Sequence, residues 1–124
     1  MSLEIVITPE ANNGKRILIE GSLDSNTSSN LQQSIDANIN NSVKTTILDF
    51  EKLEFLSSAG LRVIFKVKKR MENNGGKFLM VNLQPQIIKV FEIIKAIDSM
   101  SIFKDQAELD AYLKVIQDKV IDGE

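Results

Sequence analysis

The order of apolar and polar positions along the chain predicts strands that alternate with helices. Five short runs are rich in apolar and β-branched residues, as strands are. They span residues 3–8, 16–20, 45–50, 77–81 and 102–103. The first two runs are separated by a stretch dense in turn-forming residues, from Pro9 to Gly14, so we expect an antiparallel hairpin at the start of the chain.

Four segments repeat their apolar residues with the period of a helix. The first covers about residues 27–39, and the second follows a pair of serines and ends at the turn-forming residues 73–76. Pro85 suits the first position of a third helix, and Asp105 with Glu108 resembles the capping box that starts a fourth. This last helix carries the strongest apolar stripe of the chain, which consists of Leu109, Tyr112, Leu113, Ile116 and Val120.

This order of elements predicts an α/β fold. Strands that are separated by helices pair in parallel through right-handed crossovers, and the opening hairpin adds one antiparallel edge strand. We therefore expect a mixed, mostly parallel sheet of four to five strands packed with about four helices. Because the sequence has neither an internal repeat nor a long linker, we expect residues 1–124 to form a single domain.

The serine pair lies on the loop between the strand at residues 45–50 and the second helix. Loops at the carboxyl ends of parallel strands form the functional edge of such sheets, and the turn at residues 21–24 is expected at the same edge. Ser57 or Ser58 can cap the helix, a role worth ~1 kcal/mol. A phosphate there would meet free N–H groups and the positive end of the helix dipole, so phosphorylation also suits this place.

Composition argues against a catalytic role for these serines. The chain has no histidine and no cysteine, which excludes a Ser-His-Asp triad, thiolate catalysis and metal sites built on either residue. The loop also lacks a Ser-x-x-Lys or Gly-x-Ser-x-Gly spacing. We therefore expect that the protein is not an enzyme and that it binds neither a cofactor nor a metal ion. A hydrolase with a lysine or carboxylate base is the catalytic alternative.

Charge and hydropathy narrow the choice of partners. The formal net charge of −2 gives no electrostatic reason to expect nucleic acid or an acidic membrane surface. No apolar stretch approaches the ~20 residues that span a bilayer, and the first residues do not resemble a secretion signal. We therefore expect a cytoplasmic protein without direct membrane insertion.

Charged residues near the serines have structural and functional interpretations. Asp24 suits an Asx-type cap before the first helix, and Asp49 suits a turn at a strand end or a support for the serine loop. The second helix carries five positive charges between residues 62 and 70, which we interpret as a solvated outer face. Arg62 is the exception, because it lies one turn beyond Ser58 and can contact a partner or a phosphate.

Four segments in this order carry a family resemblance. They are Gly21-x-Leu23-Asp24, residues 47–50, residues 55–62 with the sequence Phe-Leu-Ser-Ser-Ala-Gly-Leu-Arg, and Gly75-Gly76 before an apolar strand. Together they resemble the STAS domain of bacterial anti-sigma-factor antagonists over nearly the whole chain. The Ser-Ser-Ala-Gly-Leu-Arg segment is the most specific part of the match.

The resemblance implies a set of site residues. In that family the phosphorylated serine stands two residues before the glycine, which is Ser58 here. Ser57 replaces an Asp that many members carry, and it offers an alternative acceptor. The resemblance places Asp24 on the partner-binding face, together with Ser57, Ser58, Gly60 and Arg62.

The resemblance also implies a function in signal transduction and transcription regulation. Such a phosphoprotein works by partner switching: unphosphorylated, it binds an anti-sigma factor that is also a serine protein kinase, which frees the sigma factor. Phosphorylation of Ser58 weakens the complex, and a serine phosphatase resets it. The alternative is a STAS subunit of a transport or stress-signalling assembly that acts as a non-phosphorylated interaction module.

Overall fold

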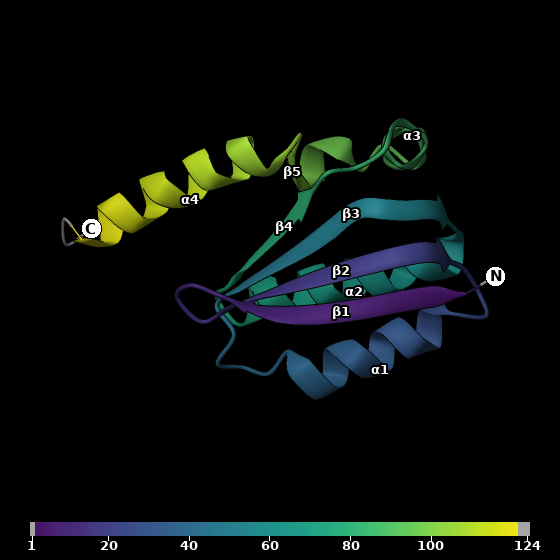
Figure 1. The fold of residues 1–124 in the computed structure, drawn as a ribbon, viewed down its shortest axis with the longest axis horizontal. Coiled ribbons are helices and arrows are strands. Elements are labelled where there is room, and N and C mark those ends of the chain that lie inside the picture. Colours follow the sequence, from purple (N-terminus) through teal and green to yellow (C-terminus); the bar gives the residue numbers. More distant parts are fainter. Residues whose placement is uncertain (1, 122–124) are drawn as a thin grey trace.

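The computed structural model describes residues 2–121, and within them the chain forms five strands and four α-helices (Figure 1). The strands are β1 (Leu3–Glu10), β2 (Gly14–Leu23), β3 (Thr45–Leu56), β4 (Lys77–Val81) and β5 (Ser101–Phe103). The helices are α1 (Ser28–Asn38), α2 (Ser58–Asn73), α3 (Pro85–Ile93) and α4 (Gln106–Ile121), with a 3-10 turn at Ile97–Ser99. None of the helices in this part of the chain is long and apolar enough to cross a membrane.

The strands form one mixed sheet in the order β1-β2-β3-β4-β5. β1 pairs with β2 in the antiparallel sense, and all other neighbours are parallel. The hairpin between β1 and β2 turns through Asn12 and Asn13, whose φ angles of 60° and 61° are left-handed values that asparagine tolerates. The expected mixed α/β sheet with one antiparallel edge strand is confirmed.

Helices cover the two faces of the sheet unequally. On one face, α1, α2 and α3 pack on a large core that includes Ile19, Phe50, Ile64 and Phe91, all with no exposed surface. On the other face, a small cluster of Ile47, Leu79, Val81 and Leu109 lies under the first half of α4. Figure 1 shows α1 and α4 on opposite sides of the sheet, with the far end of α4 extending beyond it.

β2 and β3 are longer than the sequence pattern predicts, since they run to Leu23 and Leu56 rather than to residues 20 and 50. The two strands stay paired across two register shifts, and the last partners are Leu23 and Leu56 themselves. Gly21 permits the second shift: its φ is +106°, and a Cβ there would lie 2.3 Å from the Ser2 carbonyl oxygen. As a result, the loops that follow β2 and β3 begin side by side.

The apolar stripe of α4 is only partly used. Leu109 is fully buried, whereas Tyr112, Leu113 and Ile116 are half-buried. The side chain of Val120, the last residue expected in the stripe, lies outside the described residues. The helix starts as expected, because the Asp105 carboxylate accepts from the Glu108 N–H at 3.0 Å.

Candidate functional site

The two serines have different positions at the start of α2. Ser57 is the N-cap, with an extended backbone (φ −96°, ψ 174°), and its Oγ accepts from the Gly60 N–H at 3.3 Å. Ser58 is the first helical residue and is exposed. Its hydroxyl bonds to none of the residues that the structure describes. Capping thus falls to Ser57, while the Ser58 hydroxyl faces solvent.

A backbone hydrogen bond joins the serine loop to the loop after β2. The Ser57 N–H donates to the Leu23 carbonyl oxygen at 2.9 Å. This contact confirms that both loops lie at the same edge of the sheet, which is the right-hand end of Figure 1.

Gly60 is buried between the same elements. A Cβ on this residue would lie 2.6 Å from Leu23 Cγ and 2.9 Å from Leu56 Cδ1. Only glycine therefore lets the first turn of α2 approach the ends of β2 and β3 this closely. Gly60 thus serves the internal packing of the domain, and a contact between Gly60 and a partner protein stays a prediction.

Asp24 orders the turn before α1. Its Oδ1 accepts from the Asn26 N–H at 2.9 Å, from the Thr27 N–H at 3.1 Å and from Thr27 Oγ1 at 3.2 Å. This is the Asx-type turn that the sequence suggests. Asp24 is half-buried and follows Leu23, whose carbonyl oxygen accepts from the Ser57 N–H. It therefore lies near the serine loop, and a contact between Asp24 and a partner protein stays a prediction.

Asp49 neither stands in a turn at a strand end nor supports the serine loop, as the sequence suggested, because β3 continues for seven residues beyond it. It is buried within the strand and forms an ion pair with Arg16 of β2 at 2.8 Å. Its other oxygen accepts from Asn82 Nδ2 at 3.2 Å and from the Glu51 N–H at 3.0 Å. The carboxylate thus joins β2 and β3 and does not bind the serine loop.

The positive charges of α2 differ in their surroundings. Lys68 pairs with Glu72 at 2.8 Å, and Arg70 pairs with Asp36 of α1 at 2.6 Å. Hydrogen bonds from Arg70 and then Gln32 lower the pKa of Asp36. The sequence interpretation placed all these charges except Arg62 on a solvated outer face of the helix. It therefore missed the contact between α1 and α2 that Arg70 forms.

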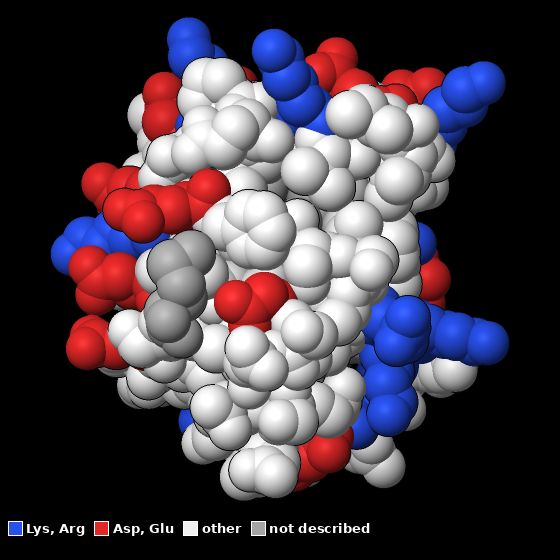
Figure 2. All heavy atoms as spheres, turned by 90° about the vertical axis from the view of Figure 1, so that its right-hand side faces the viewer, with Lys and Arg blue, Asp and Glu red and all other residues white. Residues whose placement is uncertain are grey.

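Arg62, Lys66 and Lys69 are exposed and form no ion pair within residues 2–121. Arg62, one turn after Ser58, is thus available to an outside group. Figure 2 shows the end of the molecule where β2 and β3 finish. Much of its middle is uncharged around one acidic group, other acidic side chains gather mainly along one side, and Lys and Arg lie mainly along the other side and at the top.

Phe55 adds an apolar group that the sequence interpretation does not single out. It lies two residues before Ser57, and 48% of its surface is exposed. The only signal in the sequence is a large aromatic residue that follows the charged residues Lys52 and Glu54 and precedes the serine pair. An exposed aromatic residue next to the serine loop suits a surface that contacts another protein.

A family model for the STAS domain matches residues 6–109. The chain belongs to the STAS domain family. This confirms the resemblance to that family. The matched range includes most of β1, the whole of β2 to β5 with the serine loop, and the first turn of α4.

One relative of this STAS domain is named as an anti-sigma factor antagonist. A protein of Bordetella bronchiseptica, named BtrV as a candidate anti-sigma factor antagonist, is 31% identical over 75 residues. That alignment covers 60% of this chain and 65% of the relative, so the chain spans somewhat less than two thirds of its length.

Solved structures show the same fold. The anti-sigma factor antagonist SpoIIAA in its unphosphorylated form has a TM-score of 0.74 at 21% identity, covering 90% of this chain and 97% of that one. The phosphorylated form of SpoIIAA, a Bacillus cell fate determinant, has a TM-score of 0.69 at 22% identity, covering 88% and 99%. An anti-sigma factor antagonist from Mycobacterium paratuberculosis has a TM-score of 0.78 at 19% identity, covering 94% and 95%.

Proposed function

We propose that this STAS domain is an anti-sigma factor antagonist whose binding to its partner is switched by phosphorylation of Ser58. The observation that carries the proposal is the difference between the two serines. The Ser57 hydroxyl is engaged by the Gly60 N–H, whereas Ser58 is exposed at the first position of α2. The names of the Bordetella relative and of both SpoIIAA structures support this function.

A phosphate on Ser58 suits the start of α2 electrostatically. It adds up to about two negative charges at the positive end of the helix dipole. Arg62 lies four residues further along the same helix, a spacing that brings side chains together. Phosphorylation is therefore expected to leave the domain folded and to change only its surface.

The same phosphate would weaken a complex formed on this end of the molecule. Phe55 and the uncharged surface in Figure 2 suit an interface that excludes water. Burying a phosphate there costs desolvation, and a negatively charged partner surface would also repel it. The partner in this proposal is an anti-sigma factor that is also a serine protein kinase, and a serine phosphatase restores the unphosphorylated form.

The proposal makes the protein a cytoplasmic binding module and not an enzyme. Within residues 2–121, no group of three or more acidic side chains is placed to hold a metal ion. Asp24, the acid of the neighbouring loop, is engaged in its own turn through Oδ1. In this role the domain needs no cofactor, because its chemistry is supplied by the kinase and the phosphatase.

The test is to incubate the protein with ATP and the kinase-like anti-sigma factor of its own organism, and to map the product by mass spectrometry. We expect one phosphate on Ser58, none in the Ser58→Ala variant, and unchanged phosphorylation in Ser57→Ala once that variant is shown to be folded. A phosphate on Ser57 alone would contradict the assignment of the site.

No phosphorylation at all would contradict the switch. In that case, retention of a transport or stress-signalling assembly during purification, with normal binding by Ser58→Ala, would favour the alternative interaction module.

A further inference from the structure

The outer face of α2 carries a stripe of positive charge, which consists of Arg62, Lys66 and Lys69. These residues follow one another at intervals of four and then three positions, so they lie on one side of the helix, and all are exposed. The buried residues of α2, such as Ile64, lie on the opposite side. Ser58 stands four positions before Arg62, so this basic stripe starts beside the candidate phosphorylation site.

Acidic side chains of the domain leave the basic stripe unpaired. Within residues 2–121, none of its three cations forms an ion pair. Asp36 of α1 is the acid whose pKa responds to Lys66, but Arg70 holds its carboxylate at 2.6 Å. The pKa of Asp36 is lowered first by that hydrogen bond, and the charge of Lys66 adds the smallest effect. Asp36 thus serves Arg70, and the stripe keeps its charge.

This positive charge is not the general character of the chain. The formal net charge of the whole chain is −2, yet α2 alone has five positive residues and one negative residue. The remainder of the chain is therefore net acidic. The helix dipole adds positive potential at the start of α2, which is the end that carries Ser58. Positive potential is thus gathered on the outer face of this one helix.

An aromatic side chain lies within the basic stripe. Phe65 is three positions after Arg62 and four before Lys69, and it is only half-buried. Arginine and aromatic residues are enriched where proteins contact each other. Nucleic acid is a weaker fit, because its binding depends on many phosphate contacts and the remainder of this chain is net acidic. The stripe is therefore complementary to an acidic protein surface.

We propose that the basic stripe contacts an acidic surface of the anti-sigma factor, next to the contact at the serine loop. This inference rests on the proposed function, because it assigns the stripe to the same partner. It also gives phosphorylation two effects on that contact. A phosphate on Ser58 repels the acidic surface, and it competes for Arg62, which lies one helical turn away.

The test is to measure the association and dissociation of the unphosphorylated full chain and the kinase-like anti-sigma factor of its own organism, by surface plasmon resonance at about 20 and 300 mM salt. In K66E/K69E the association rate should fall at least about tenfold at the lower salt concentration, because charge complementarity chiefly accelerates association. The difference should shrink at the higher concentration, where charges are screened. K66Q/K69Q, which only removes the two charges, should lie between K66E/K69E and the native protein.

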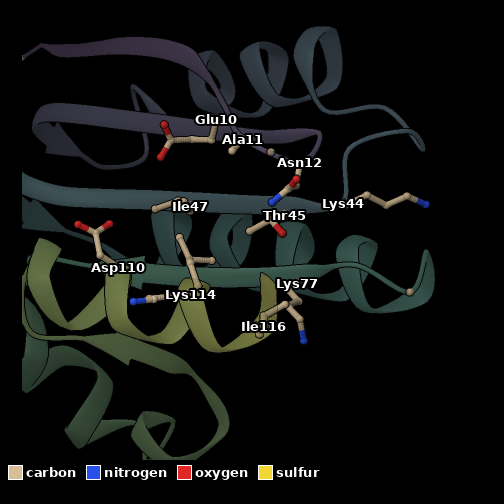
Figure 3. Close-up of a pocket in the computed structure, with 13 residues that line it drawn as sticks. Glu10, Ala11, Asn12, Lys44, Thr45, Ile47, Lys77, Asp110, Lys114 and Ile116 are labelled. Atoms are coloured by element: carbon tan, nitrogen blue, oxygen red, sulfur yellow. The ribbon is translucent and has the colours of Figure 1, made fainter. Parts of the chain in front are cut away.

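A matched control makes the same change of charge at the other end of the sheet. Lys44 directly precedes β3 and Lys77 begins β4, so both lie at the end opposite the serine loop. Both are exposed, and Figure 3 shows their side chains pointing apart, beside the groove between α4 and the sheet. K44E/K77E should associate with the anti-sigma factor like the native protein. Unfolding curves establish that every variant is folded.

The inference is overturned if folded K66E/K69E associates as fast as K44E/K77E at low salt while the native protein binds. It is also overturned if duplex DNA binds the native protein as tightly as the anti-sigma factor does and K66E/K69E loses that binding, since the stripe would then serve nucleic acid. Both results leave the phosphorylation switch itself standing. If the native protein does not bind the anti-sigma factor at all, the proposed function fails and this inference fails with it.

Discussion

The Ser57 N–H and the Leu23 carbonyl oxygen, 2.9 Å apart, join the loops that follow β2 and β3. Leu23 also lies against Gly60, so the same residue supports the serine loop from its backbone and from its side chain. The candidate phosphorylation site therefore rests on the buried ends of two paired strands. This arrangement presents Ser58 on a fixed helix start and not on a free loop.

Gly60→Ala should destabilise the domain by about 1–3 kcal/mol, because overpacking at a tight contact forces neighbouring side chains to move. The new Cβ would lie 2.6 Å from Leu23 Cγ. Urea unfolding measures the effect. In a Leu23→Ala background the same substitution should cost less, since the main clash is gone. A cost below about 0.5 kcal/mol in the native background would contradict the close packing.

The two serines should differ in their effect on stability. Ser57→Ala removes the cap of α2 and should cost about 1 kcal/mol. Ser58→Ala removes an exposed hydroxyl without a partner among the described residues, so it should change stability by less than about 0.5 kcal/mol. Denaturant unfolding of both variants checks this, and the reverse order would mean that Ser58 is the capping residue.

The ion pair of Arg16 and Asp49 should be sensitive to the loss of one partner. Only 6% of the Asp49 side chain is exposed, and Asp49→Ala leaves the half-buried Arg16 with its longer contact to Glu10 as its ion pair, so the variant should cost about 1–3 kcal/mol. The matched control is Glu72→Ala, which breaks the exposed pair with Lys68 and should cost less than about 1 kcal/mol. Similar losses of unfolding free energy in the two variants would show that the buried ion pair contributes no more to stability than the exposed one.

Acid should weaken the contact between α1 and α2. The pKa of Asp36 is lowered in the folded state from its ordinary value of 3.8, chiefly by the hydrogen bond from Arg70. A carboxyl group with a lowered pKa adds stability above its unfolded pKa and loses it as the pH falls through the folded value. The native protein should therefore be more stable than Asp36→Asn at pH 7, and this difference should shrink below about pH 4.

Thermal unfolding of the two proteins between neutral and acid pH measures that difference. Because Asp36 is exposed, added salt should also reduce it at pH 7. A difference that stays constant with both pH and salt would mean that the Arg70 contact contributes nothing through charge.

Local patterns were sufficient to predict the order of the elements and the start of α2. Periodicity depends on residues close in sequence, and so do turn formers such as Pro85 or the glycines before β4. The continuation of β3 beyond residue 50 depends on other information. Glu51, Lys52 and Glu54 argue against a strand, yet their segment stays paired with β2, which is more than 30 positions away in the sequence.

The roles of individual site residues depended still more on distant partners. Asp49 is an ion-pair residue only because Arg16 lies beside it, 33 positions away. Gly60 has a packing role only because Leu23 occupies the space next to it. Neither relationship leaves a mark within a short window of sequence. The backbone angles of Ser57 likewise decide which serine caps α2. The sequence alone cannot distinguish the two, because they are adjacent and identical.

The most direct test of the proposed switch is calorimetric titration of the kinase-like anti-sigma factor with four proteins: native, Ser58→Ala, Ser58→Asp and Ser57→Asp. Native and Ser58→Ala should bind alike. A carboxylate at position 58 mimics part of the phosphate charge, so Ser58→Asp should bind at least about tenfold more weakly while remaining folded. Ser57→Asp, which keeps a capping acceptor, should bind more tightly than Ser58→Asp. Tight binding by a folded Ser58→Asp protein would contradict the account.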